Sequence, residues 1–147
     1  MENKYYTPTI EEFHVGFEYE ELSGTDSEGG EDWSTREIIH SFGAFDEDID
    51  ALEDGFIRVK YLDKQDIEEL GFKRLNSKIL DNILDEYRIP YNDSTNEIIS
   101  LIIREGRVVI SYGYKETPLD KFKTWFAGYI KNKSELKRVL KMLDINA

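Results

Sequence analysis

Residues 98–114 read IISLIIREGRVVISYGY and hold the clearest structural signal in the sequence. Two runs rich in β-branched residues, 98–103 and 107–114, flank Glu105 and Gly106. A two-residue connection that ends in glycine closes a β-hairpin, because glycine readily adopts the positive φ angle that such a turn needs. This stretch therefore predicts two antiparallel strands joined by a tight turn.

Four further segments have the composition or the period-two alternation of β-strands. In residues 13–20 every second side chain is apolar, as expected for a strand with one buried face. The other strands are expected at 33–40, 57–61 and 125–130. Together with the hairpin, these segments predict a mainly antiparallel sheet of about six strands.

Two helices are expected between the third and fourth of these strands. Asp63 is a suitable N-cap for a helix at 64–70, which Gly71 would end in a left-handed conformation. A second helix is expected from Ser77 to the residue before Pro90, because apolar residues recur there at helical spacing.

A third, C-terminal helix begins after Asn132, which forms a capping-box-like start with Glu135. This helix is amphipathic: one face carries apolar residues and the other carries basic ones, the apolar residues being Leu136, Val139, Leu140 and Leu143. Strands followed by helices, a hairpin, a strand and a last helix predict an α+β fold.

The length and composition of the chain predict one folded domain. The chain has 147 residues, of which 39% are hydrophobic and 13% aromatic, too many for a disordered protein. We therefore expect a single domain over 1–147, with a mobile acidic loop at 21–32 and a second acidic loop at 46–55. Cysteine is absent, no run approaches the roughly 18 apolar residues of a membrane helix, and a signal-peptide pattern is lacking, which favours the cytoplasm.

The negative charge of the chain is concentrated in its N-terminal part. The net charge is −12, and residues 1–56 hold 17 Asp and Glu against two basic residues. Such a charge disfavours direct binding of DNA or RNA, because it repels the phosphate backbone. A dense carboxylate surface can instead occupy a protein groove built for phosphates, since both anions satisfy the same Lys and Arg side chains.

We therefore predict a partner-binding surface in two acidic stretches. Its candidate residues are Glu18, Glu20, Glu21, Asp26, Glu28, Glu31, Asp32, Asp46, Glu47, Asp48, Asp50, Glu53 and Asp54. The simpler interpretation is that these stretches are solvated loops that keep the protein soluble. A calcium loop is disfavoured, because Ala51 and Ile57 stand where that motif requires glycine and glutamate.

A second candidate surface combines lysines with aromatic side chains near the C-terminus. Lys115, Lys121, Lys123 and Lys131 lie close in sequence to five aromatic residues, which are Tyr112, Tyr114, Trp125, Phe126 and Tyr129. Such a mixture can stack bases and hold phosphates, although it also arises from the two faces of ordinary strands. It predicts a possible site for a nucleotide or RNA.

An enzymatic role is not expected. His14 and Glu18 would lie about 13 Å apart along a strand, too far to share one metal ion. His40 lies beside Ser41, but adjacent residues of a strand point to opposite faces. A P-loop motif is absent, and the sequence indicates neither a metal site nor a cofactor.

Three segments of the chain carry a family resemblance. They are residues 5–20, residues 57–63 together with 67–72, and residues 128–137. They resemble small uncharacterised proteins encoded by phages and mobile elements of Bacteroidota. This resemblance implies an accessory protein acting in the cytoplasm of a bacterial host, where such proteins include anti-CRISPR inhibitors.

The charge and this implied context lead to the same hypothesis. The protein is expected to inhibit a bacterial immune effector, such as the type VI-B RNA-guided nuclease, by placing its acidic surface in a basic nucleic-acid site. The alternative is a protein that sequesters a nucleotide immune signal through its lysine-rich surface. A hydrolase that depends on His14 or His40 is a third hypothesis.

Overall fold

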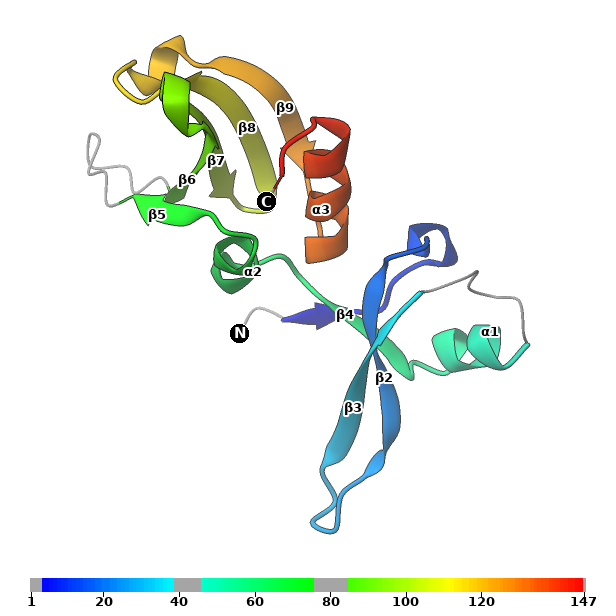
Figure 1. Ribbon diagram of the computed structural model, residues 1–147. Coiled ribbons are helices and arrows are strands. Elements are labelled where there is room, and N and C mark those ends of the chain that lie inside the picture. Colours follow the sequence, from blue (N-terminus) through cyan, green and yellow to red (C-terminus); the bar gives the residue numbers. More distant parts are fainter. Residues whose placement is uncertain (1–3, 39–45, 76–84, 147) are drawn as a thin grey trace. The chain divides into compact units, whose positions relative to one another are not determined.

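The computed structural model describes residues 4–38, 46–75 and 85–146, with only the backbone given for 46–49. Contacts divide the chain into two compact units, Met1–Tyr61 and Leu62–Ala147, which are described separately. Each unit contains one antiparallel sheet with helices (Figure 1). The α+β fold is thus confirmed, but the described ranges form two sheets with nine strands instead of one sheet with about six.

The first unit is built on a four-stranded sheet with the order β1-β4-β2-β3. Its elements are β1 (Tyr5–Tyr6), the 3-10 helix η1 (Ile10–Glu12), β2 (Glu18–Thr25), β3 (Glu31–Glu37), the helix α1 (Asp46–Glu53) and β4 (Ile57–Lys60). The core is small: Phe17, Ile38 and Val59 are buried, and half-buried aromatic rings pack around them. Contacts at the surface of the sheet must therefore contribute to holding this unit together.

The strand predicted at 13–20 begins only at Glu18. Gly16 has a φ of 90°, a left-handed conformation that interrupts an extended run. The rings of Phe13 and Phe17 meet with their centroids 4.9 Å apart. The alternating aromatic residues thus pack around a turn and not along one strand face.

Both segments predicted as acidic loops contain regular structure. Within 21–32, β2 continues to Thr25 and β3 begins at Glu31, because backbone pairing across the hairpin does not require apolar side chains. Most of 46–55 is the helix α1.

The second unit is a five-stranded antiparallel sheet with strands in sequence order (Figure 1). The strands are β5 (Lys73–Leu75), β6 (Asp85–Asn92), β7 (Glu97–Arg104), β8 (Arg107–Tyr114) and β9 (Lys123–Tyr129). The helical segments are α2 (Lys64–Glu69), η2 (Asp93–Thr95), η3 (Leu119–Lys121) and α3 (Lys133–Met142). Side chains of α2 and α3 share one core with β6, β7 and β8, so both helices cover the same face of the sheet.

The central hairpin and two of the predicted helices are confirmed. Glu105 and Gly106 both have positive φ angles, 50° and 81°, as a tight hairpin turn requires. Asp63 accepts a hydrogen bond from the backbone N–H of Asp66 at 3.0 Å at the start of α2. Asn132 accepts one from the backbone N–H of the third residue of α3 at 2.8 Å.

The helix predicted from Ser77 to the residue before Pro90 is wrong over its described part. Residues 85–92 form β6, and the rest of the predicted helix lies outside the described residues. Tyr87 and Ile89 point to the core and are 0% and 9% exposed, in the period-two pattern of a strand. The stability gained by pairing with β7, whose side chains are strongly apolar, therefore exceeds what a helix with the same apolar spacing would gain.

The boundary between the two units falls between Tyr61 and Leu62, and the backbone N–H groups of both residues are hydrogen-bonded. The backbone N–H of Tyr61 donates to the carbonyl oxygen of Lys4 at 2.9 Å, within the first unit. The next N–H, that of Leu62, donates to Lys131 at 2.7 Å, within the second unit. Consecutive peptide groups are thus fixed in different units. In the described parts of the chain, the helices are too short or too polar to span a membrane.

Candidate functional site

The β2–β3 hairpin carries much of the first acidic stretch. From Glu18 to Asp32 the sequence has seven carboxylates and no lysine or arginine. The two strands are paired from Glu18 with Glu37 to Thr25 with Glu31, with one irregularity after Leu22. Figure 1 shows this hairpin extending beyond the other strands of the first unit.

Five of these seven carboxylates are engaged in the fold. Glu20 pairs with Arg58 at 3.3 Å, and Glu21 pairs with Arg36 at 3.5 Å. Glu18 and Glu31 also interact with neighbouring groups, Glu31 by accepting from the indole N–H of Trp33 at 3.1 Å. These four glutamates therefore stabilise the fold, in addition to being candidates for contacts with a partner.

Asp26 organises the tip of the hairpin. One of its carboxylate oxygens accepts hydrogen bonds from the backbone N–H groups of Glu28 at 2.9 Å and Gly30 at 2.7 Å. Its own N–H donates to the carbonyl of Gly30 at 2.7 Å. An Asx-type turn of this kind fixes the short connection between the strands. The tip is therefore a defined turn.

The two remaining carboxylates of the hairpin face solvent. Glu28 and Asp32 are exposed and make neither a side-chain hydrogen bond nor an ion pair with any described residue. The same holds for Asp50, Glu53 and Asp54, within and directly after α1. The remaining candidates, Asp46, Glu47 and Asp48, lie in the part of α1 where only the backbone is described.

Arg58 of β4 contacts side chains of the β2–β3 hairpin and of β1. Its guanidinium carbon lies 3.8 Å from the centroid of the Tyr5 ring and 4.0 Å from that of Trp33. One of its terminal nitrogens contacts Glu20 at 3.3 Å. Two cation–π contacts and an ion pair with Glu20 thus hold this half-buried arginine in place.

The four lysines of the predicted nucleotide surface lie at different positions of the second unit. Lys121 is the last residue of η3, and Lys123 begins β9. Lys131 follows β9, where its backbone N–H donates to Glu135 at 2.6 Å. Lys115 lines a groove together with Arg88 and other residues of β5, β6 and β7.

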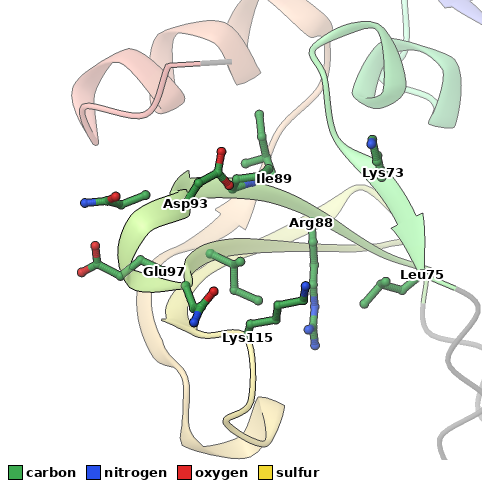
Figure 2. A pocket seen from close by; sticks show the side chains of 11 residues that line it. Lys73, Leu75, Arg88, Ile89, Asp93, Glu97 and Lys115 are labelled. Carbon is green, nitrogen blue, oxygen red and sulfur yellow. The ribbon is translucent and has the colours of Figure 1, made fainter.

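This groove has a volume of about 290 Å³ and an amphipathic lining. Three cations line it, Lys73, Arg88 and Lys115. The other lining residues are Leu75, Ile89, Pro90, Asn92, Asp93, Asn96, Glu97 and Ile98. In Figure 2 the side chain of Lys115 points toward Arg88, whereas Asp93 and Glu97 lie on the other side of the view.

Of the three cations of the groove, Arg88 has an ion-pair partner among the described residues, whereas Lys73 and Lys115 have none. Arg88 pairs with Glu86 at 2.8 Å, and this glutamate also accepts a hydrogen bond from the Ser100 hydroxyl at 3.0 Å. Glu86 is buried, so that pair serves the interior of the sheet. Lys73 and Lys115 are exposed, and their ammonium groups have no ion pair with a described residue.

Glu97 is an ionised carboxylate held in place by its neighbours. Hydrogen bonds from the Thr95 hydroxyl, at 2.5 Å, and from the Tyr112 hydroxyl lower the pKa of Glu97 below its usual value. The same bond to Glu97 raises the pKa of Tyr112, which therefore stays protonated. One of the residues that line the groove is therefore a carboxylate that its neighbours hold in place.

No protein family, curated protein or solved structure matches this chain.

The aromatic residues predicted to stack on bases contact one another. The rings of Tyr112 and Trp125 are stacked with centroids 4.9 Å apart, and Tyr91 meets both edge-on at 5.9 and 5.7 Å. Tyr114 contacts Tyr112 at 6.0 Å, and Phe126 packs against the core. Tyr112, Trp125 and Phe126 are therefore used within the fold, whereas Tyr114 and Tyr129 are 49% and 75% exposed.

The histidines do not assemble a catalytic group in the described residues. The ring of His14 meets the edge of Phe17 with centroids 5.6 Å apart, which is a packing contact. His40 and Ser41 lie outside the described residues. In the described part of the chain, no group of three or more His, Asp or Glu side chains is arranged to hold a metal ion.

Of the three cations that line the groove, sequence reasoning identified Lys115 and missed Lys73 and Arg88. They are register partners on β5 and β6. The helix predicted across residues 77–89 concealed this pairing. The alternation of Glu86 and Arg88 with apolar neighbours was the signal that could have revealed it.

Proposed function

We propose that this chain is a non-enzymatic inhibitor that docks its acidic first unit onto a basic nucleic-acid-binding site of a bacterial immune effector. The observation that supports this most is the β2–β3 hairpin, which presents Glu28 and Asp32 on a paired and defined scaffold. Carboxylates on an ordered hairpin lose little conformational entropy on binding, which favours affinity.

The charge of the first unit gives the attraction a long range. Residues 1–61 hold 17 acidic and four basic residues, whereas residues 62–147 hold 14 acidic and 15 basic ones. The field that steers association therefore comes from the first unit. It acts over about 8 Å at physiological ionic strength and less in higher salt.

The first target to test is the type VI-B RNA-guided nuclease, which the resemblance to phage and mobile-element proteins of Bacteroidota suggests. Its RNA channel must bind phosphates, and lysines and arginines that do so also pair with carboxylates. In this proposal the inhibitor acts in the host cytoplasm and competes with RNA.

Charge reversal on the hairpin tests this proposal. Glu28→Lys combined with Asp32→Lys changes two exposed residues that have no partner among the described residues. The matched control is Glu116→Lys with Asp120→Lys, which changes the charge equally at exposed positions of the second unit. The measurements are affinity for the purified nuclease and inhibition of its RNA cleavage, each at low and high salt.

The hairpin variant should lose inhibition, whereas the control should keep it. Binding of the unmodified protein should weaken as salt rises, since exposed charges are screened. Full inhibition by a folded hairpin variant would refute the acidic docking. If the nuclease is not bound at all, a pull-down from RNase-treated host lysate, at two salt concentrations and with the same variants, would search for another effector.

The alternative function is sequestration of a nucleotide immune signal. In this alternative, Lys115, Lys121, Lys123 and Lys131 would hold the phosphate groups of the nucleotide. Among these four described lysines, Lys115 alone lines the groove of the second unit. We therefore place the acidic docking first.

A further inference from the structure

We infer that the groove of the second unit binds a small phosphorylated molecule with the size and chemistry of a nucleoside monophosphate. This inference is independent of the acidic docking, because the groove and the hairpin belong to different units. It narrows the alternative function to one site and one class of ligand. Three properties of the groove carry it: size, a cationic side and an acceptor side.

The size and apolar lining of the groove suit a ligand with a flat or apolar body. Its volume of about 290 Å³ is at the lower end of the range for small-molecule sites, roughly 300–1,000 Å³. Leu75, Pro90 and Ile98 provide apolar surface against which a base or sugar can lie. A larger ligand, such as a folded RNA, could place only one nucleotide there.

The cationic side recognises the phosphate. Arg88 presents a planar guanidinium, of which one nitrogen is bonded to Glu86 and the remaining N–H groups can donate elsewhere. Lys115 points toward it in Figure 2, and Lys73 lines the same groove. The two lysines lack ion-pair partners among the described residues, so an anion can neutralise them without breaking an existing pair.

The acceptor side limits the ligand to one phosphate and adds selectivity. Asp93 and Glu97 also line the groove, and the hydrogen bonds around Glu97 keep it ionised. Carboxylates repel a second or third phosphate group but accept hydrogen bonds from hydroxyl and amino groups. A ribose and a base supply such donors at the opposite end of the molecule from the phosphate.

Calorimetric titration of the full chain tests this assignment. The probes are AMP, GMP, CMP, UMP, ATP, adenosine and inorganic phosphate. We expect saturable binding of at least one monophosphate, with weaker binding of ATP, adenosine and phosphate. Lys73→Gln and Lys115→Gln should each weaken the binding about tenfold, since each removes a charge-assisted contact. Both residues are exposed, so the variants should fold.

The matched control is Lys123→Gln, which removes the same charge from an exposed residue that does not line the groove. It should bind as the unmodified protein does. Absence of saturable binding for all four monophosphates would overturn the inference, as would equal loss in the Lys123 variant. Equal affinity for adenosine and AMP would overturn the role of the cations, and equal affinity for inorganic phosphate would overturn that of the apolar lining. None of these substitutions touches the hairpin, so the two proposals can fail separately.

Discussion

The guanidinium carbon of Arg58 lies 4.0 Å from the centroid of the Trp33 ring, and this contact joins β4 to β3 across the strand between them. The same guanidinium lies against Tyr5 of β1 and pairs with Glu20 of β2. One side chain therefore touches all four strands of the first sheet. Among the described residues of the first unit the core cluster contains Phe17, Ile38 and Val59, and Ile57 is buried as well, so we expect this contact to contribute noticeably to stability.

Replacing Arg58 should destabilise the first unit. Arg58→Ala removes two cation–π contacts and one ion pair, and should lower the free energy of unfolding by about 2 kcal/mol. Urea denaturation followed by the fluorescence of Trp33, in a Trp125→Phe background, measures this change.

The control is Arg36→Ala, which removes an exposed ion pair with Glu21. Such a pair contributes roughly 0–1 kcal/mol, so the expected change is small. Equal effects of the two substitutions would show that the aromatic contacts of Arg58 do not contribute.

Removing the hydroxyl of Tyr87 should leave the second unit at least as stable as before. Tyr87 is 0% exposed, and its hydroxyl lacks a hydrogen-bond partner among the described residues. A buried unsatisfied group destabilises by about 1–3 kcal/mol, so Tyr87→Phe should raise the free energy of unfolding or leave it unchanged. Tyr87→Ala should lower it by about 3–5 kcal/mol through loss of packing. A marked loss in the phenylalanine variant, measured by denaturant titration, would mean that the hydroxyl is satisfied.

Adding a methyl group at Gly113 should disturb the packing of β8 against Phe122. A Cβ atom there would lie 2.5 Å from Cε1 of Phe122, too close for any real contact. Gly113→Ala should lower stability by about 1–3 kcal/mol, the usual effect of overpacking. Adding Phe122→Leu should recover part of this loss, and thermal unfolding of both single variants and the double variant measures the coupling. Strictly additive effects would contradict the contact.

The bond between Glu97 and Tyr112 should make stability depend on acidic pH. The pKa of Glu97 is lowered in the folded state, first by Thr95 and then by Tyr112, so its stabilising effect is present above the unfolded pKa of about 4.3. The effect is lost as the pH falls through the lower folded value. Glu97→Gln should therefore be less stable than the unmodified protein at pH 7, and the gap should close in strong acid. In a Tyr112→Phe background the gap at pH 7 should be smaller, and an unchanged gap would argue against the bond.

The sequence was most informative where local and tertiary signals agree. The turn at Glu105 and Gly106 and the caps at Asp63 and Asn132 are set by residues within a few positions of each other. Such features were predicted correctly. The buried face of α3, with Leu136 and neighbouring residues, also follows from spacing alone.

The sequence was least informative where long-range pairing decides the structure. Pairing with Leu101 of β7 places Tyr87 in a strand, although its spacing from preceding apolar residues suggested a helix. The division into two sheets depends on which strands pair, and alternation within a strand does not specify its partners.

The candidate sites show the same limits. Net charge identified the acidic stretch but could not separate Glu28 and Asp32, which are free of described partners, from residues such as Glu20 that are bound within the fold. The groove depends on the register of Lys73 with Arg88, which the sequence alone did not reveal.

The adjacent amide protons of Tyr61 and Leu62 are protected from solvent exchange by hydrogen bonds within different units. The first can exchange with solvent only when its bond to Lys4 opens, and the second only when its bond to Lys131 opens. Their exchange rates therefore report the opening free energies of two units from neighbouring positions in one spectrum. Equal exchange rates for the two amide protons would indicate that the units open together, and different rates would indicate that they open independently.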